Sequence, residues 1–284
     1  MKERLIAAAC VFIFFQPASV LAANNGFILM ASTIGPIDSG IVAALEDQFE
    51  KDSGIRVRHV GAGTGAAMDI ARKCNVDLVL VHAKALEEKF VQEGYGTGRI
   101  PLMFNDFVIV GPSADPAGVK GMKSAIQALK TIADKGAMFV SRGDKSGTHV
   151  AEMDLWAKTG ITPSGPWYTV YEKGSEGNVP TLLFTDQKGA YTVIDRATYL
   201  TVKDTIKIAV LVEGDEVLLN HISLIPVNPV KCPRVHNKDA LIYVNWLVDP
   251  DKGQKIIQTF GREKYGQPLF FPESDAFKAK NRKQ

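Results

Sequence analysis

Three segments of the chain share one pattern: an apolar strand, a turn of small or hydroxyl residues, and then a helix. They are "MASTIGPIDSG" at 30–40, "GAGTGAA" at 61–67 and "VSRGDKSGTH" at 140–149. The start of a helix exposes free backbone N–H groups and carries a partial positive charge, so it attracts anions. In open α/β sheets such turns lie at the carboxyl ends of strands, where ligands bind. Three of them in one chain therefore predict a shared ligand rich in acceptor oxygens.

The alternation of apolar strands and amphipathic helices continues along the chain and predicts an α/β layer fold. Asp38-Ser39 is expected to cap the first helix, whose apolar positions recur at helical spacing up to Phe49. The last helical region is expected to be two helices broken at Asp249-Pro250. The predicted strands cover 26–33, 55–63, 76–82, 105–110, 137–141, 190–195, 206–212 and 221–229, and the predicted helices cover 41–49, 64–73, 83–93, 124–136, 149–160, 179–189 and 238–266.

The order of these elements predicts two α/β lobes with a ligand cleft between them. With 284 residues the chain is long enough for both. The crossings between the lobes are expected near 107–110 and 215–225. The expected division is a signal peptide at 1–22, the first part of lobe 1 at 23–104, lobe 2 at 105–213, and a return to lobe 1 with the C-terminal helices at 214–284.

The N-terminus has the pattern of a secretory signal peptide. Lys2 and Arg4 precede an apolar run of eleven residues, and "VLA" at 20–22 supplies the small residues that a signal peptidase needs. The alternative, a membrane anchor, needs a longer apolar run to span a bilayer. We therefore expect cleavage after Ala22 or Ala23 and export of the remaining chain to the periplasm.

The charge balance of the chain argues against a nucleic-acid or membrane partner. It holds 33 basic and 31 acidic residues, a formal net charge of +2, which falls to +1 without the signal peptide. Such a balance gives no broad electrostatic field. The one basic run, "KAKNRKQ" at the C-terminus, is most simply a solvated chain end.

Cysteine spacing argues against a metal site. Cys10 leaves with the signal peptide, whereas Cys74 and Cys232 remain. In an oxidising compartment these two form either one disulfide or two buried thiols. Neither has a Cys or His at metal-ligand spacing. The glycine turn "GAGTGAA" lacks the Lys-Ser/Thr pair of a P-loop, so we expect neither a metal nor a cofactor.

Arg142 is the strongest candidate ligand residue in the sequence. Its rigid fork of donors suits an oxyanion, and Ser146-Gly147-Thr148 follow it at a predicted helix start. Asp144 is expected to be a turn or cap residue paired with Arg142 or the lysine beside it. His149 would sit in the first helical turn in a surface or structural role.

The segment "AYTVIDRATYL" at 190–200 holds four further polar candidates. Asp195 and Arg196 are expected to cap the short helix that follows them. Tyr191 and Thr192 would end near the interface between the lobes, so they are candidate ligand contacts.

The sequence gives no positive sign of an enzyme. It lacks G-x-S-x-G, H-E-x-x-H and a cysteine placed for nucleophilic attack. The five histidines are scattered singly, and each is expected to be structural or exposed: His59, His82, His149, His221 and His236. A Ser/His/Asp set assembled in space stays open as an alternative, because such groups need not be neighbours in sequence.

The chain resembles a known family, the periplasmic substrate-binding proteins of ABC importers, and within it the tungstate-binding, TupA-type members. The resemblance covers nearly the whole chain after the signal peptide and rests on "GAGTGAA", "VDLVLVHA", "FVQEGYG", "NDFVIVGP", "SRGDKSGTHVAE" and "AYTVIDRATYL". It implies a type II periplasmic-binding-protein fold that closes around one oxyanion and delivers it to a membrane permease. It also implies the ligand residues Ser32, Thr33, Thr64, Arg142, Ser146, Gly147 and Thr148.

Two departures from the family pattern bear on the ligand. The first turn of the family usually reads Thr-Thr-Thr-Ser, and here Ile34 and Gly35 stand in place of two of its hydroxyl residues. The segment "GSEGNVPT" at 174–181 stands where the family tends to carry Gly-Met-Gly, and Ala197 replaces a usual glycine.

The resemblance implies a transport protein, not an enzyme. The implied ligand is tungstate, or molybdate, and the implied partners are an inner-membrane permease and its ATPase, with the binding protein a monomer. A phosphate- or sulfate-binding paralogue is the alternative within the same class. An exported hydrolase or transferase that uses the same anion cradle as an oxyanion hole is the alternative from another class.

Overall fold

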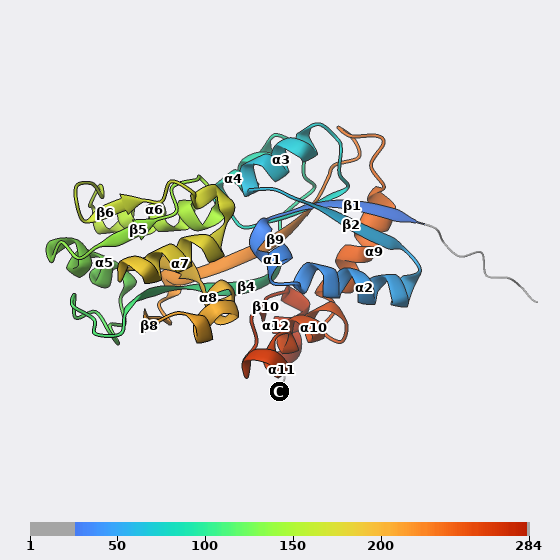
Figure 1. Cartoon of the computed structure of the whole chain (residues 1–284). Helices are drawn as coiled ribbons and strands as arrows, with labels where there is room; N and C mark the ends of the chain where they lie inside the picture. The colour runs from blue at the N-terminus through green and yellow to red at the C-terminus, as the bar shows by residue number, and fades with distance from the viewer. Residues whose placement is uncertain (1–25, 283–284) are drawn as a thin grey trace, which may run out of the picture.

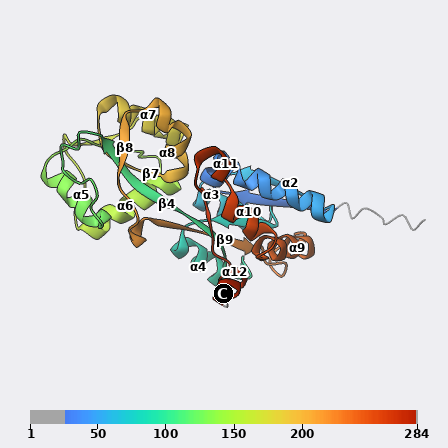
Figure 2. The same cartoon turned by 90° about the horizontal axis from the view of Figure 1, so that it is seen from below.

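One long strand, β4 (Ile100–Pro112), belongs to both halves of the molecule, which the computed structural model describes over residues 26–282. Its first part pairs with β9 (Leu219–Pro226), and its second part, from Phe107 onward, pairs with β7 and β8. Figures 1 and 2 show two groups of elements joined by β4 and β9. The expected signal peptide and its cleavage site lie outside the described residues.

Lobe 1 is built on a mixed sheet with the strand order β10-β4-β9-β3-β1-β2. The strands β2, β1 and β3 are parallel to one another, whereas β9 pairs with β3 in the antiparallel direction. Its other elements are β1 (Phe27–Ser32), β2 (Arg56–Gly61), β3 (Leu78–Val81), β10 (Phe271–Pro272), α1 (Ile34–Asp38), α2 (Ile41–Ser53), α3 (Thr64–Arg72), α4 (Lys84–Gln92), α9 (Asn237–Val248), α10 (Gly253–Thr259), α11 (Arg262–Tyr265) and α12 (Asp275–Asn281).

Lobe 2 surrounds the second part of β4. The strands β7 and β8 pair antiparallel with β4, and β5 pairs in parallel with β6. The elements of this lobe are α5 (Ala125–Asp134), β5 (Phe139–Ser141), α6 (Gly147–Thr159), β6 (Tyr168–Val170), α7 (Asn178–Lys188), β7 (Thr192–Asp195), α8 (Arg196–Val202) and β8 (Ile208–Val212).

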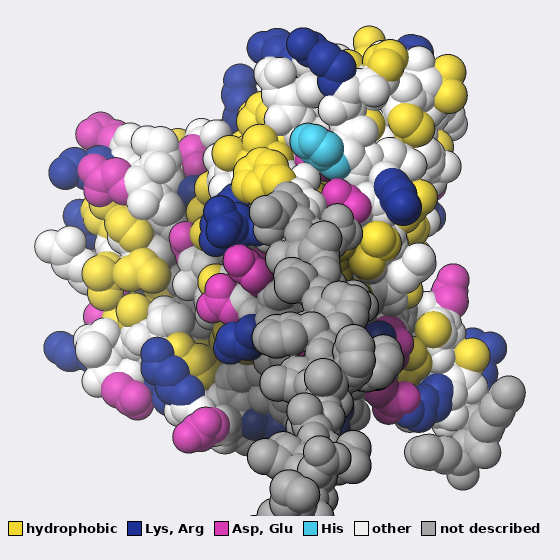
Figure 3. Space-filling view, turned by 90° about the vertical axis from the view of Figure 1, so that its right-hand side faces the viewer, with side chains coloured by type: hydrophobic (Ala, Val, Ile, Leu, Met, Phe, Trp, Pro, Cys, Tyr) yellow, Lys and Arg dark blue, Asp and Glu magenta, His cyan; other side chains and the backbone are white. Residues whose placement is uncertain are grey.

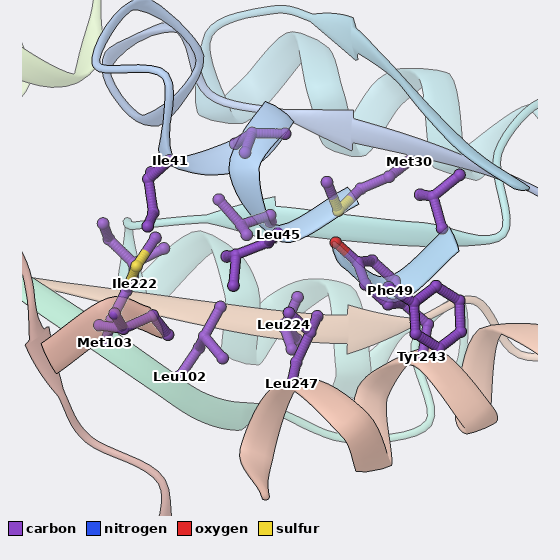
Figure 4. Close-up of a cluster of buried hydrophobic side chains, with 14 of the residues drawn as sticks. Met30, Ile41, Leu45, Phe49, Leu102, Met103, Ile222, Leu224, Tyr243 and Leu247 are labelled. Carbon is purple, nitrogen blue, oxygen red and sulfur yellow. The ribbon is translucent and has the colours of Figure 1, made fainter. Parts of the chain in front are cut away.

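Strand periodicity places apolar side chains on both faces of each sheet, because successive side chains of a strand point to opposite faces. In β3, Leu78 and Leu80 join the cluster that packs under α2 and α9, whereas Val79 and Val81 join the cluster under α3. Figure 4 shows the first cluster, in which Leu45 and Phe49 of α2 meet the sheet and α9. Helices therefore cover both faces, as an α/β layer fold requires.

The start of α2 differs from the sequence prediction. Asp38-Ser39 was the expected cap, but α2 begins after Gly40, whose φ is 85°. A glycine adopts this left-handed conformation without strain, so the chain can turn there between two helices. Asp38 instead ends the short helix α1. The C-terminal region likewise forms three helices, α9, α10 and α11, where two were expected.

A disulfide joins Cys74, just after α3, to Cys232, which precedes α9. The sulfur atoms lie in the apolar cluster between α3 and the sheet, and Cys232 is fully buried. Of the two alternatives that the sequence left open, the structure shows the disulfide. A crosslink over 158 positions restricts the unfolded chain strongly and so stabilises the folded one.

The surface carries mixed charge. Acidic and basic side chains are interspersed on the face in Figure 3, in keeping with the small net charge of the chain. Within residues 26–282, no helix combines the length and the apolar character needed to cross a membrane.

Candidate anion-binding site

A cavity of about 430 Å³ lies between the two lobes. We call it the cleft cavity. Its walls come from the turns after β1, β2 and β3 in lobe 1, from the loops that start α6 and α7 in lobe 2, and from β4 and β9 between them. It is lined by Thr33, Ile34, Gly35, Pro36, Asp38, Gly63, Gly65, Ala66, His82, Asn105, Phe107, Arg142, Asp144, Lys145, Ser146, Gly147, Thr148, Ser175, Asn178, Asp195 and Asn220.

Arg142 is held in place by three acceptors of its own lobe. Its Nε donates to the carbonyl of Gly174 at 3.0 Å, Nη1 donates to the side chain of Asn178, and Nη2 pairs with Asp144 at 2.9 Å. The pairing of Asp144 with Arg142 agrees with the sequence prediction. A guanidinium has five N–H donors, so two remain for a ligand. The side chain is only 9% exposed and lines the cavity, which fixes where those two donors can act.

Asn178 links Arg142 to a buried carboxylate. Its amide oxygen accepts from Arg142 and its amide nitrogen donates to Asp195 at 2.7 Å. Asp195 also accepts from the backbone N–H of Thr198 at 2.8 Å and from its hydroxyl at 2.6 Å, and so caps α8 as expected. This chain of hydrogen bonds orients the guanidinium before any ligand arrives.

The start of α6 forms the part of the wall beside Arg142. Ser146 is the N-cap residue, and its hydroxyl accepts from the backbone N–H of His149 at 3.4 Å. The N–H groups of Gly147 and Thr148, in the first turn of the helix, have no intrahelical acceptor. They are therefore the natural donors to an anion in the cavity.

The lobe 1 wall contains a hydroxyl group that lacks a partner among the described residues. Thr33 is 2% exposed and lines the cavity, and its Oγ1 has no hydrogen-bond partner among the described residues. A buried polar atom without a partner costs free energy, so such an atom calls for a ligand or a bound water. Ile34 and Gly35, where the sequence departs from the family pattern, follow Thr33 in the same wall.

Two sequence-predicted residues lie elsewhere. Ser32 is fully buried and does not line the cavity, because its hydroxyl points back to the carbonyl of Thr33 at 3.2 Å. Thr64 lines an adjoining cavity, and its buried Oγ1 also lacks a partner among residues 26–282.

The expectation that Tyr191 and Thr192 contact a ligand is wrong. The hydroxyl of Tyr191 donates to Asp115 and accepts from the backbone N–H of Ala117 inside lobe 2. Thr192 donates to the carbonyl of Val140 at 2.7 Å. Both side chains therefore serve the core of lobe 2.

The cavity brings charges of both signs together. Partial burial and the nearby Asp195 raise the pKa of Asp38, and Arg142 lowers it in part. Burial raises the pKa of Asp195, opposed by its hydrogen bonds from Thr198 and Asn178. Asp38 reaches the cavity from lobe 1 and Asp195 from lobe 2, so their mutual repulsion acts across the cleft.

Sequence reasoning missed several residues of the wall, above all His82 and Asn178. His82 follows β3 and was expected to be structural or exposed, yet it lines the cavity. Burial lowers the pKa of His82 to about 4, with Asn220 beside it acting in the opposite direction. Asn178 lies in "GSEGNVPT", where a glycine before a helix start was the available signal.

Neither a cluster of metal-ligating side chains nor a pair of a histidine ring with a Ser or Thr hydroxyl occurs among the described residues. Within residues 26–282, no group of three or more His, Cys, Asp and Glu side chains could hold a metal ion. Nor does any histidine ring in this range hydrogen-bond a Ser or Thr hydroxyl; His59 and His221, for example, bond the carboxylates of Glu46 and Glu273.

Two α/β lobes that share β4, with an anion-suited cavity between them, define the class of two-lobed solute-binding proteins. Residues 19–251 match the PBP superfamily domain. The chain belongs to this superfamily, and within it to the family of the tungstate-binding protein TupA. Over 252 residues it is 41% identical to "Tungstate-binding protein TupA" of Peptoclostridium acidaminophilum, a match that covers 88% of this chain and 87% of the relative.

Solved structures agree with this assignment. The tungstate-binding protein TupA from Desulfovibrio alaskensis G20 superposes with a TM-score of 0.79 at 43% identity, over 88% of this chain and 100% of that one. The tungstate ABC transporter structure from Geobacter sulfurreducens gives a TM-score of 0.72 at 41% identity, over 81% and 97% of the two chains.

Proposed function

We propose that this protein is the solute-binding component of an ABC importer, which captures a tetrahedral oxyanion between its lobes. Tungstate is the first candidate, because the relatives at 41–43% identity are named for tungstate, and molybdate is the second. The protein binds the ion without transforming it. The proposed division of the chain is a lobe 2 at 105–213 inserted into lobe 1.

The observation that carries the proposal is the convergence of unused donors on one cavity. Arg142 offers two N–H groups, the start of α6 offers those of Gly147 and Thr148, and Thr33 offers a buried hydroxyl from the opposite lobe. Hydrogen bonds to a charged acceptor are about twice as strong as neutral ones. Several such hydrogen bonds to a dianion offset the free energy that the ion loses when it gives up its hydration shell.

The size of the cavity indicates that the ion occupies one end of it. If each of four oxygens takes the roughly 30 Å³ of a water molecule, the ion fills on the order of a quarter to a third of the cavity. The rest of the 430 Å³ cavity holds water or closes further when the lobes move together. Arg142 and the start of α6 mark the end that the ion occupies.

A phosphate- or sulfate-binding paralogue is the alternative. Ile34 and Gly35 remove two hydroxyl donors from the wall that faces the ion. A protonated oxyanion such as phosphate also needs an acceptor, and Asp38 is the carboxylate of the cavity that fills this role best. Asp144 and Asp195 are already engaged, with Arg142 and Thr198 among their partners.

The expected signal peptide places the protein in the periplasm, where its partners are a membrane permease and the ATPase of that permease. Closure over the ion creates the form that a permease recognises, since only in that form do both lobes present one joined surface. The binding protein acts as a monomer.

A thermal-shift and titration panel tests the function. The purified, processed protein is mixed with tungstate, molybdate, sulfate or phosphate in a buffer free of oxyanions. A ligand that binds only the folded state raises the melting temperature, by an amount that grows with its concentration over Kd. Tungstate and molybdate are expected to raise it most. A rise with phosphate or sulfate alone favours the alternative, and no rise with any of the four overturns the proposed function.

A further inference from the structure

A second cavity, of about 370 Å³, adjoins the cleft cavity between the lobes. We call it the rear cavity. Its walls come from α3, α4 and the start of β9 in lobe 1 and from α6 in lobe 2. Residues that line it but not the cleft cavity are Thr64, Ala83, Lys84, Leu86, Val150, Ala151, Asp154, Leu155, Lys158, Val217, Leu219 and His221. Residues that line both are Gly65, His82, Phe107, Lys145, Gly147 and Asn220.

Two of the shared residues touch each other across the cleft. His82 comes from the turn after β3 in lobe 1, and Gly147 is the first residue of α6 in lobe 2. A Cβ atom on Gly147 would lie 2.1 Å from Cε1 and 2.6 Å from Nε2 of His82. The imidazole ring therefore rests directly on the helix backbone, and no larger residue than glycine fits beneath it.

The two cavities differ in chemistry. The cleft cavity has Arg142, backbone donors and small residues, which suit the oxygens of a compact ion. The rear cavity has the exposed apolar side chains Leu86 and Val150, together with lysines of both lobes. A ligand that joined an oxyanion to an apolar group would need both cavities at once.

We propose that His82, seated against Gly147, is the rear wall of the oxyanion pocket and restricts its ligands to compact inorganic oxyanions. The proposal rests on the proposed function, and it concerns the largest ligand that the same oxyanion pocket accepts. His82 is thus a specificity-determining residue, and Gly147 is a glycine because the ring of His82 occupies the place of its side chain.

The wall acts through shape, not through charge. Because the pKa of His82 is lowered to about 4, its ring is uncharged at neutral pH. An uncharged ring does not draw anions in general, whereas its volume stands at the boundary of the two cavities, both of which it lines. Without the ring, an apolar group attached to the oxyanion can reach the apolar surface of the rear cavity.

A double-mutant cycle tests the contact. Gly147→Ala is expected to weaken tungstate or molybdate binding at least about tenfold, since its methyl group forces His82 and α6 apart. In the background of His82→Ala the same substitution is expected to change the affinity less than about twofold, because the space beneath it is then free. Gly98→Ala is the matched control: a Cβ there meets nothing within 4 Å, and Gly98 lines neither cavity. Equal losses from Gly147→Ala in both backgrounds overturn the proposal.

Phenylphosphonate, a tetrahedral oxyanion with an apolar ring, tests the size limit. By titration calorimetry it is expected to bind His82→Ala at least about tenfold more tightly than the wild-type protein. Equal affinities for the two proteins overturn the size limit.

A measurement without ligand distinguishes failure of the proposed function from failure of the contact between His82 and Gly147. If the wild-type protein binds no inorganic oxyanion, the proposed function is wrong, and small-angle X-ray scattering of the four proteins of the cycle still tests the contact. Gly147→Ala alone is expected to have a larger radius of gyration, and equal radii for all four overturn the contact.

Discussion

The two walls of the cleft cavity are built in opposite ways. In lobe 2 the guanidinium of Arg142 is already held by Gly174, Asn178 and Asp144, and the start of α6 is capped by Ser146, so the donors left for an ion are fixed in place. In lobe 1 the wall includes Thr33 and the short helix α1 that follows it, and the buried hydroxyl of Thr33 has no partner among the described residues.

This difference separates two tasks. A preorganised wall loses little freedom when an ion binds, so it supplies most of the affinity. A wall with unsatisfied groups gains hydrogen bonds only when a ligand of the right size reaches it. Lobe 2 should therefore set how tightly the ion is held, and lobe 1 should set which ion is preferred.

The largest effect is expected from lobe 2. Arg142→Ala removes two charge-assisted hydrogen bonds to the ion, worth roughly 1.5–3 kcal/mol each. Binding should weaken by about 4 kcal/mol, on the order of a thousandfold, as measured by titration calorimetry with the best oxyanion of the panel. Arg72→Ala, which breaks surface pairs with Asp69 and Glu93, is the control and should bind as the wild type does. An unchanged affinity in Arg142→Ala would remove lobe 2 from its dominant role.

The next effect concerns the stability of the protein and arises at a buried acid of lobe 2. Glu152 of α6 is 1% exposed and accepts from the hydroxyl of Tyr168 at 2.7 Å. Burial, opposed by hydrogen bonds, raises the pKa of Glu152 from 4.5 to about 7.

As pH rises from 4.5 to 7, the folded state keeps a proton that the unfolded state has lost, so stability falls and levels off above pH 7. The shift corresponds to about 3 kcal/mol. Glu152→Gln should therefore raise the free energy of unfolding by about 3 kcal/mol at pH 8, and by less than about 1 kcal/mol at pH 5. Urea unfolding at both pH values measures this, and an equal gain at both would show that Glu152 does not titrate in this range.

A smaller effect, with opposite signs for stability and binding, is expected from lobe 1. Thr33→Val keeps the shape of the side chain and removes the unpartnered hydroxyl. The ligand-free protein should become more stable by about 1 kcal/mol, since a buried unsatisfied group is lost. Oxyanion binding should weaken about tenfold, since that group is the one the ion satisfies. A Thr33→Val protein that loses stability instead would show that the hydroxyl is satisfied in the free protein, for example by water.

The smallest effect is expected at the neighbouring positions. Ile34→Thr combined with Gly35→Ser restores two hydroxyl groups, and a Cβ on Gly35 meets nothing within 4 Å. The ratio of tungstate to sulfate affinity should rise a few-fold, about 1 kcal/mol or less. A change in both affinities by the same factor would mean that lobe 1 contributes strength and not selectivity.

The sequence predicted most elements because their signals are local. The apolar periodicity of β3 and the helix start at Ser146 depend on a few adjacent residues, and both lie where expected. The left-handed turn at Gly40 and the short helix α1 escaped prediction, because a five-residue helix has too few positions to show a period. The strand β4 belongs to both lobes because it pairs with β7 and with β9, which follow it by about a hundred residues. No local sequence pattern predicts such pairing.

The candidate site divides in the same way. Arg142 and the start of α6 were found because they stand together in one motif. His82 and Asn178 were missed because each acquires its role only when distant segments meet, one against Gly147 and the other between Arg142 and Asp195. A single sequence shows a local motif, but it does not show which distant segments come into contact.

The disulfide between Cys74 and Cys232 encloses the whole of lobe 2 in a covalent ring. The chain leaves lobe 1 along β4, builds the second lobe and returns along β9, and the disulfide ties together the lobe 1 segments that precede and follow this excursion. A single nick by a protease anywhere in that ring leaves both pieces attached, so the damaged molecule keeps its mass until it is reduced. Lobe 2 can thus unravel and fold again without its ends leaving lobe 1.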